Sequence, residues 1–277
     1  PGESTPVSWG SPVMLRSYSV APSRSGRSAR LWTAASLLAL AAASVAPQAA
    51  SAADFTASDE AQLQAALNAA GASGIAQPTI GLTGSFALTG PVTLPNKVIF
   101  LDPAGFTLTG LTFNGASTLA VSGAGIVPLV GNSSAGAFSV RTGEVRLEGG
   151  ATVTAASEAN VFSGGTLVVD GAGSLLTAGN LSFANGGAAT VEVRNGGVVH
   201  ATSTSTNSAL AVNSATNLLV TGAGSRLDID GSAGFATTGS ASRSWTIADG
   251  ASSTIGGGLT IGAAASPQAI APQVTVT

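Results

Sequence analysis

Few residues of this sequence can do acid–base chemistry, and two of them stand one residue apart. Asp228 and Asp230 flank Ile229, so in a strand both carboxylates would lie on the same face. Two carboxylates on one face can raise each other's pKa or hold a cation, which makes this pair the candidate catalytic site. The alternative, which the sequence favours, is a pair of solvated charges beside the turn at Gly231.

A second group of charges recurs in two strand-like stretches. Glu144 and Arg146 alternate with apolar residues, and Glu192 and Arg194 do the same 48 residues later (192 − 144). If these residues face outward at equivalent positions, they form a surface strip of stacked charges, extended by Glu148. Exposed ion pairs contribute about 0 to 1 kcal/mol each. The strip is therefore either a solvated face or a candidate binding surface.

The other reactive residue types exclude several kinds of chemistry. The chain has no cysteine and one histidine, His200, which excludes disulfides, thiolate zinc sites, cysteine catalysis and sites built from several histidines. No Gly-x-Ser-x-Gly sequence occurs at a strand-to-helix turn, which disfavours a serine hydrolase. Glycines 256–258 lack the Lys-Ser/Thr that follows a phosphate-binding loop. We expect His200 to be a surface residue, and we expect no metal or other cofactor.

The composition indicates a packed protein without affinity for nucleic acid. Of 277 residues, 44% are hydrophobic and 8% are charged, against roughly 25% charged residues in an ordinary soluble domain. The 37 glycines and 12 prolines are too few for low-complexity disorder. With 10 basic and 13 acidic residues, the chain has no cationic surface that would neutralise phosphates, so we expect no nucleic-acid partner.

The N-terminal part has the pattern of a signal peptide. A basic cluster at residues 24–30 precedes an apolar stretch over 31–46, and a small-x-small triplet ends at Ala52. We expect cleavage after Ala52, which removes residues 1–52 as upstream sequence and signal peptide. A transmembrane anchor is disfavoured because proline and glutamine follow the apolar stretch. The start of translation stays open, because Met14 is the only methionine.

One helix is expected after the cleavage position, within an N-terminal cap at residues 53–78. The helix should cover about 58–70, with Asp59 and Glu60 as capping charges in its first turn and Gly71 as its end. Its apolar residues have the i, i+3, i+4, i+7 spacing of a helix face: Leu63, Ala66, Leu67 and Ala70.

Residues 79–277 have the pattern of short strands separated by glycine turns, and short sequence phrases within them, each a strand and its turn, repeat along the chain. The octet at 118–125 returns at 166–173 and at 217–224, with offsets of 48 (166 − 118) and 51 (217 − 166). Propeller blades, stacked hairpins and a parallel β-solenoid all repeat in this way, but the regular signature of a propeller is absent. With coils of roughly 20 to 25 residues, the repeat is two coils, and this region supplies about eight to ten. The last strand pattern has no cap, so we expect the sequence to be truncated there.

These phrases resemble the passenger domains of bacterial type V autotransporters. The resemblance rests on Val-x-Gly-Ala-Gly-Ser at 169–174 and 220–225, on the strand-Asn-Gly-Gly-Val phrase at 193–198, on the signal peptide and on the lack of cysteine. It covers about residues 53–277 and implies a right-handed parallel β-helix. It also implies export through the inner membrane and a place at the cell surface or in the medium. The C-terminal β-barrel that would carry such a passenger across the outer membrane is missing from this sequence.

The expected function is that of a structural or adhesive rod without catalysis, of the kind that serves in adhesion and virulence. Its partner would be a host surface, a glycan or another copy of itself. The alternative is a secreted polysaccharide lyase or hydrolase on a pectin-lyase-like β-helix, with Asp228 and Asp230 as the catalytic pair. A third interpretation is a stalk that spaces a functional domain from the cell.

Overall fold

The structure is a computed structural model of the whole chain, which divides into two units, residues 1–48 and 49–277. The predicted signal peptide and its cleavage position lie outside the residues that the structure describes. Within the described ranges, no helix is both long and apolar enough to cross a membrane. The described residues are 53–185, 187–204, 208–235, 243–261 and 273–277.

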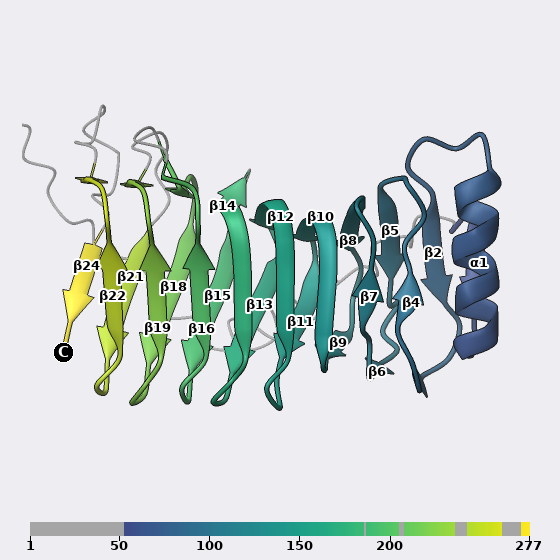
Figure 1. Cartoon of the computed structure of the whole chain (residues 1–277), viewed down its shortest axis with the longest axis horizontal. Helices are drawn as coiled ribbons and strands as arrows, with labels where there is room; N and C mark the ends of the chain where they lie inside the picture. The colour runs from purple at the N-terminus through teal and green to yellow at the C-terminus, as the bar shows by residue number, and fades with distance from the viewer. Residues whose placement is uncertain (1–52, 186, 205–207, 236–242, 262–272) are drawn as a thin grey trace, which may run out of the picture. The chain divides into compact units, whose positions relative to one another are not determined.

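The second unit is a parallel β-solenoid of about 8 turns with one helix at its N-terminal end (Figure 1). Its strands form a long sheet of fifteen strands, a short sheet of seven and a two-stranded piece, and strands that are neighbours in a sheet come from successive coils. The pairing within each sheet is parallel, as in the pairs of β12 with β14 and of β13 with β15. The prediction of a parallel β-helix is therefore confirmed.

The long sheet supplies two segments of each coil. Its strands bend between these segments, because the pairing register shifts between Ala135 and Ala137 and again between Ala155 and Glu158. The first segment contains β4 (Val92–Thr93), β7 (Phe113–Asn114), the first halves of β10 (Asn132–Val140), β12 (Thr152–Phe162) and β14 (Leu175–Asn185), then β16 (Val198–Ala201), β19 (Arg226–Ile229) and β22 (Ser252–Ile255). The second segment contains β1 (Phe55–Ala57), β2 (Thr79–Leu82), β5 (Ile99–Asp102), β8 (Thr118–Val121), the second halves of β10, β12 and β14, then β17 (Leu210–Val212), β20 (Ala233–Phe235) and β23 (Leu259–Ile261).

The short sheet supplies the third segment of each coil. The two-stranded piece continues it towards the N-terminus through single bridges, such as Thr107 to Ile126. The short sheet contains β9 (Ile126–Leu129), β11 (Gly143–Leu147), β13 (Gly165–Asp170), β15 (Ala189–Arg194), β18 (Thr216–Thr221), β21 (Ser244–Ala248) and β24 (Gln273–Val276). The two-stranded piece contains β3 (Phe86–Ala87) and β6 (Leu108–Thr109).

Inward side chains stack on their equivalents in the next coil and form one continuous core. Because side chains alternate along a strand, every second residue of each segment points inward. Burying one such Val, Leu or Phe side chain contributes roughly 1.5 to 3 kcal/mol. One column of the short sheet, buried throughout, consists of Val127, Val145, Leu167, Val191, Leu218 and Trp245.

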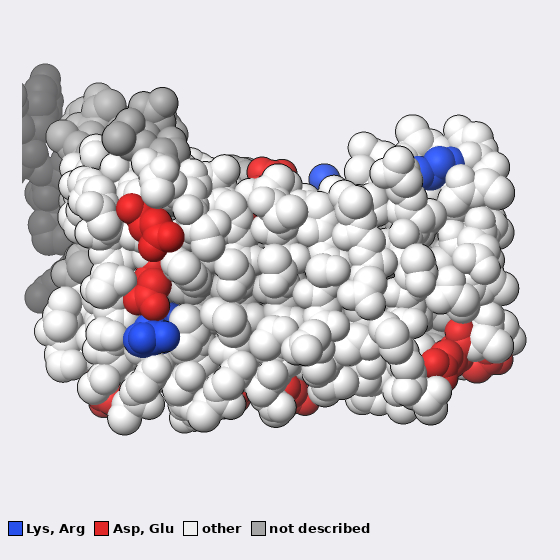
Figure 2. All heavy atoms as spheres, viewed as in Figure 1, with Lys and Arg blue, Asp and Glu red and all other residues white. Residues whose placement is uncertain are grey.

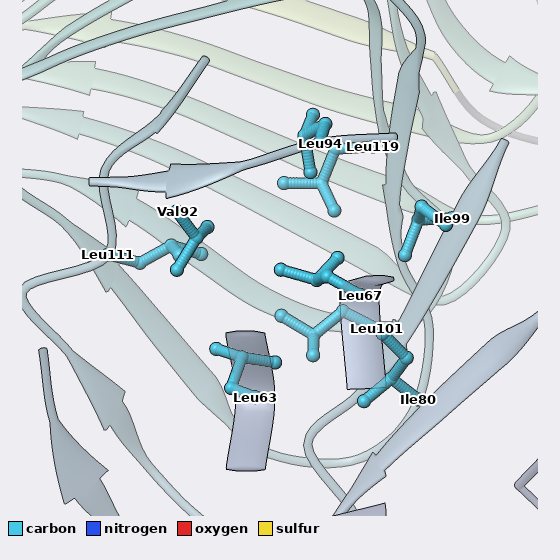
Figure 3. Close-up of a pocket in the computed structure, with 9 residues that line it drawn as sticks. All are labelled: Leu63, Leu67, Ile80, Val92, Leu94, Ile99, Leu101, Leu111 and Leu119. Atoms are coloured by element: carbon cyan, nitrogen blue, oxygen red, sulfur yellow. The ribbon is translucent and has the colours of Figure 1, made fainter. Parts of the chain in front are cut away.

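The helix α1 (Glu60–Ala72) covers the N-terminal end of this core. Asp59 is its N-cap, with a side chain that accepts a hydrogen bond from the Gln62 backbone at 2.8 Å. Leu63 and Leu67 point into the first coils among the apolar side chains drawn in Figure 3. The space left among these side chains is only about 10 Å³, and its lining is apolar. The apolar face of the predicted helix thus fills the end of the stack.

The helix boundaries and the start of the solenoid differ from the expected ones. The helix runs past Gly71 to Ala72, and the Ser73 N–H then bonds to the carbonyls of the last turn. Gly71 does not end the helix but allows a close approach, because a Cβ there would lie 2.8 Å from Cβ of Pro95. The strand β1 precedes the helix and already pairs with β2, so the solenoid begins before Thr79.

Polar contacts fasten the helix to the coils beneath it. Glu60 accepts hydrogen bonds from the hydroxyl and the backbone N–H of Thr89, at 2.8 and 3.1 Å. These bonds lower the pKa of Glu60 below its ordinary value. At the other end of the helix, the Lys97 ammonium donates to the carbonyls of Ala70, Ser73 and Ile75. The cap is therefore held at both ends by charged groups as well as by its apolar face.

The corners between the short and the long sheet explain the two-coil period of the sequence. Ser174 and Ser225, both 0% exposed, each donate a hydrogen bond of 2.7 Å to the carbonyl four residues earlier. Each hydroxyl also accepts a bond from a glycine N–H in the preceding coil, from Gly150 at 3.3 Å and from Gly196 at 3.0 Å. The serine hydroxyl of each Gly-Ala-Gly-Ser corner thus accepts a hydrogen bond from the Gly-Gly corner of the preceding coil. Because the two corner types alternate, the phrase returns every second coil.

The first octet does not belong to this series. The second and third octets align in the short sheet, where Thr166 pairs with Thr190 and Thr190 with Asn217. Residues 118–121, by contrast, form β8 in the long sheet, so the three octets are not equivalent rungs as the repeat implied. The reason is that an alternating strand followed by Gly-x-Gly suits a corner on either sheet. The first octet also lacks the serine, since Ile126 follows its last glycine.

The corner bond yields the first prediction. In Ser225→Ala the Gly196 N–H loses its acceptor inside the corner, which should lower the free energy of unfolding by roughly 1 to 3 kcal/mol. Urea unfolding measures the loss, and hydrogen exchange at the Gly196 amide should accelerate. Ser252→Ala is the matched control, because this exposed hydroxyl has no hydrogen-bond partner in the described residues; it should change stability by less than about 0.5 kcal/mol. Equal midpoints for the two variants would contradict the proposed role of the corner bond.

Candidate functional site

The candidate carboxylate pair lies on the outer side of the long sheet. Asp228 lies within β19 and Asp230 follows its last residue, with side-chain exposures of 23% and 47%. In the view of Figure 2, charged side chains gather over β19 while the surface around them is mostly uncharged. The shared face expected from the sequence is therefore where charge concentrates on this side of the solenoid.

Each carboxylate of the pair is engaged by a different neighbour. Asp228 accepts a hydrogen bond from the Thr254 hydroxyl at 2.8 Å and lies 3.6 Å from the Arg226 guanidinium. Asp230 Oδ1 lies 3.0 Å from Nε2 of His200. These contacts make two separate polar groups: Asp228 with Arg226 of its own strand and Thr254 of β22, and Asp230 with His200 of β16. The arrangement can hold a substrate by hydrogen bonds, but the contacts of each acid point to its own neighbour and not to a shared reacting atom.

The contact of His200 with Asp230 is a feature that sequence reasoning missed. The two residues are thirty positions apart, but β16 and β19 are neighbours in the long sheet, and His200 pairs directly with Asp228. The coil between these strands has 28 residues (228 − 200), which is longer than half of either offset of the repeat, so the repeat gave no signal for this contact. His200 is one-third exposed, so it is a surface residue as expected, but it is not isolated.

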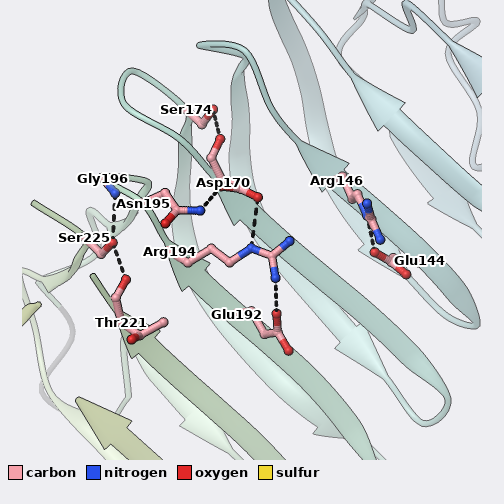
Figure 4. A network of polar contacts seen from close by, with 10 residues as sticks. All are labelled: Glu144, Arg146, Asp170, Ser174, Glu192, Arg194, Asn195, Gly196, Thr221 and Ser225. Carbon is pink, nitrogen blue, oxygen red and sulfur yellow. Dashed lines mark hydrogen bonds and ion pairs between the residues drawn. The ribbon is translucent and has the colours of Figure 1, made fainter. Parts of the chain in front are cut away.

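The surface strip is a set of short-range ion pairs on the short sheet (Figure 4). Arg146 binds Glu144 within β11. Arg194 contacts Glu192 on its own strand at 3.1 Å and Asp170 on the preceding coil at 2.9 Å. Two of these ion pairs, Glu144 with Arg146 and Glu192 with Arg194, each lie within a single strand. The pair of Arg194 with Asp170 joins two coils.

The register of the strip differs from the one expected. Arg146 pairs with Val168, which pairs with Glu192, so the two-coil spacing at this place is 46 residues (192 − 146) and not 48. Glu144 aligns with Thr190 by the same path, and opposite charges rather than like charges follow one another along the column. The prediction of equivalent charges was wrong because it assumed that the glutamates at 144 and 192 occupy the same place in their coils.

Electrostatics in this strip centre on Asp170. Burial alone would raise the pKa of Asp170, but hydrogen bonds from Asn195 and Arg194 and the charges of Arg194 and Arg146 together lower it below its ordinary value. The Asn195 amide donates to Oδ1 at 2.8 Å. The hydrogen bond to Glu144, opposed by burial, raises the pKa of the Arg146 guanidinium. Both arginines of the strip are therefore paired with acids, which leaves neither of them free for an anionic partner.

No feature of the described residues points to a bound metal. Among them, no three side chains of His, Asp or Glu come together as a ligand group.

Comparison of the chain with protein-family models, with curated proteins and with solved structures finds no match. The function must therefore be argued from the solenoid and its surface.

The lowered pKa of Asp170 predicts a specific acid sensitivity. A carboxyl group with a lowered pKa in the folded state adds stability above its ordinary pKa of 3.8, and this stability is lost as the pH falls through the folded value. The unfolding midpoint of the unchanged chain should exceed that of Asp170→Asn at pH 6, and the difference should shrink as the pH falls to 3. Ser252→Ala in the same series should show no such convergence. A constant difference would mean that Asp170 is not held in its charged form.

Proposed function

We propose that this chain is an exported β-helical passenger of the autotransporter type, with a structural or adhesive role and no catalysis in these residues. The observation that carries the proposal is the parallel solenoid of about 8 turns behind a sequence with the pattern of a signal peptide. A solenoid coil contacts only its neighbours, so the rod can fold coil by coil as the chain emerges from a membrane. The lack of cysteine means that no disulfide has to form on the way.

The outer faces support a role in presentation over one in catalysis. After residue 52 the chain has 6 basic and 12 acidic groups, a net charge of −6 (6 − 12). Such a surface stays soluble and is not drawn to anionic lipid or nucleic acid. Many of the described charged groups are paired with a neighbour, as in the surface strip. A rod that repeats similar weak contacts along its length gains affinity through avidity.

A second function, polysaccharide cleavage, is favoured by one observation. His200 contacts Asp230 and is the register partner of Asp228, so an imidazole lies beside the pair of acids. Histidine is a common general acid or base in catalysis. This arrangement is the best candidate on the described surface for a lyase or hydrolase site. The separate hydrogen bonds of the two acids argue against it, and so we place it second.

Export is tested by cell fractionation. Expressed with its N-terminal segment in a Gram-negative bacterium, the chain should leave the cytoplasm, and its product should begin at Ala53 by mass spectrometry. Leu38→Arg puts a charge into the apolar stretch and should keep the product in the cytoplasm, whereas the matched Leu38→Val should be exported. Full-length product found only in the cytoplasm for the unchanged chain would refute the proposal.

Catalysis is tested with acidic polysaccharides. We expect no release of unsaturated or reducing ends above background from the unchanged chain. Should activity occur, the double variant Asp228→Asn, Asp230→Asn decides its origin, with Asp249→Asn as the control at an exposed acid on a different turn. Activity that disappears in the double variant and persists in the control would establish the enzyme and overturn our preference.

A further inference from the structure

An open cleft of about 290 Å³ lies on the second segment of the long sheet, close to the capped end of the solenoid. It is lined by side chains of β2 and β5, of the residue after β8 and of the loop before β2. Its size is at the lower limit of ligand pockets, roughly 300 Å³. A ligand of one or two small rings fits this volume. The residues are Gln77, Thr79, Phe100, Asp102 and Ser122.

The polar groups of the cleft are largely unengaged by the protein. In the described part of the chain, no hydrogen bond involves the Gln77 amide or the hydroxyls of Thr79 and Ser122. Asp102 uses one carboxylate oxygen, Oδ1, to accept from the Ala104 N–H at 2.8 Å, and no described donor reaches Oδ2. The lining of the cleft therefore offers a carboxylate, an amide and two hydroxyls, which together both donate and accept hydrogen bonds.

The Asp102 carboxylate is held in place by the backbone around it. Besides its bond to Ala104, it lies against Gly123 of the next coil, where a Cβ would come within 1.8 Å of Oδ1. Gly123 has a φ of +129°, which disfavours a side chain there for a second reason. A glycine at this point of the turn leaves the space that the carboxylate fills. The acceptor of the cleft is thus pre-positioned, which reduces the entropy cost of binding.

The lining also contains an aromatic ring, that of Phe100, which pairs with Thr79 between β5 and β2. Phe100 is half-buried, and the Arg141 guanidinium lies 4.9 Å from its ring centroid and 4.7 Å from that of Phe162. Arg141 has no carboxylate partner among the described residues, so the two rings are what hold it. Phe100 lines the cleft, whereas Arg141 and Phe162 lie outside its lining.

We propose that this cleft binds a neutral pyranose unit of a glycan. A pyranose presents hydroxyl pairs at its edge and C–H groups on its face, and the cleft has the complement of each: the Asp102 carboxylate with the Gln77 amide for the hydroxyls, and the Phe100 ring for the apolar face. Hydrogen bonds to a charged acceptor are the stronger kind and discriminate against ligands without a donor there.

Other ligand classes fit this chemistry less well. An anion such as phosphate or a uronate would place its charge beside Asp102, with a single cation, Arg141, outside the lining. A metal ion would find only one carboxylate. The proposal rests on the adhesive role proposed above and adds the ligand to it, at the end of the rod that the helix seals.

Saturation-transfer NMR and titration calorimetry with the purified full chain test this site. The probes are neutral oligosaccharides built from glucose, galactose or mannose, and oligogalacturonate as the acidic comparison. At least one neutral probe should bind saturably, and Asp102→Asn and Phe100→Leu should each weaken that binding at least tenfold. Ser122→Ala, which removes only a hydroxyl, should weaken it less. Unfolding midpoints of all variants establish that they are folded.

Two matched controls locate the site. Phe162→Leu removes the other ring on Arg141, which does not line the cleft, and Asp249→Asn removes an exposed acid after β21, outside both candidate sites. Both variants should bind within twofold of the unchanged chain. The proposal fails if no neutral probe binds, if only oligogalacturonate binds, or if Asp102→Asn binds as tightly as the unchanged chain. Because binding is measured on purified protein, these outcomes are independent of the fractionation result.

Discussion

The whole structure depends on one constraint: each coil must stack on the next in a register that lets inward side chains meet and corner polar groups find partners. Parallel strands leave their backbone groups unpaired unless the neighbouring coil supplies them. The corner serines show how strictly this holds, because a hydroxyl at Ser225 serves its own strand and the Gly196 amide of the coil below. In this chain, two alternating corner types satisfy the polar groups of both coils.

The same constraint determines which outward residues become neighbours. In a solenoid, residues one coil apart lie side by side however far apart they are in the sequence. Asp170 therefore meets Arg194, and His200 meets Asp230, across 24 and 30 residues. Coil length changes along the stack, from 18 residues between Ile126 and Glu144 to 29 between Ser244 and Gln273 (144 − 126; 273 − 244). A small change of coil length moves which side chains meet without disturbing the core.

On such a scaffold, we expect binding sites where the repeating pattern of packed and paired side chains is interrupted. The regular core columns form a continuous support, and the surface strip is part of this support because both of its arginines are paired with acids. The cleft at Phe100 and Asp102 differs, since its polar groups point to solvent with few bonds of their own. We propose that the sealed end serves recognition and the repeating body serves extension.

The sequence by itself determined the solenoid, its two-coil period and the capping helix, because alternation, glycine corners and helical spacing are local patterns that burial must obey. It did not determine the register of the charges, the sheet on which the first octet lies, or the partner of His200. Those depend on the exact number of residues in each coil and on which corner a glycine phrase occupies. Only the tertiary structure decided them, because contacts between coils are made by residues that no local pattern relates.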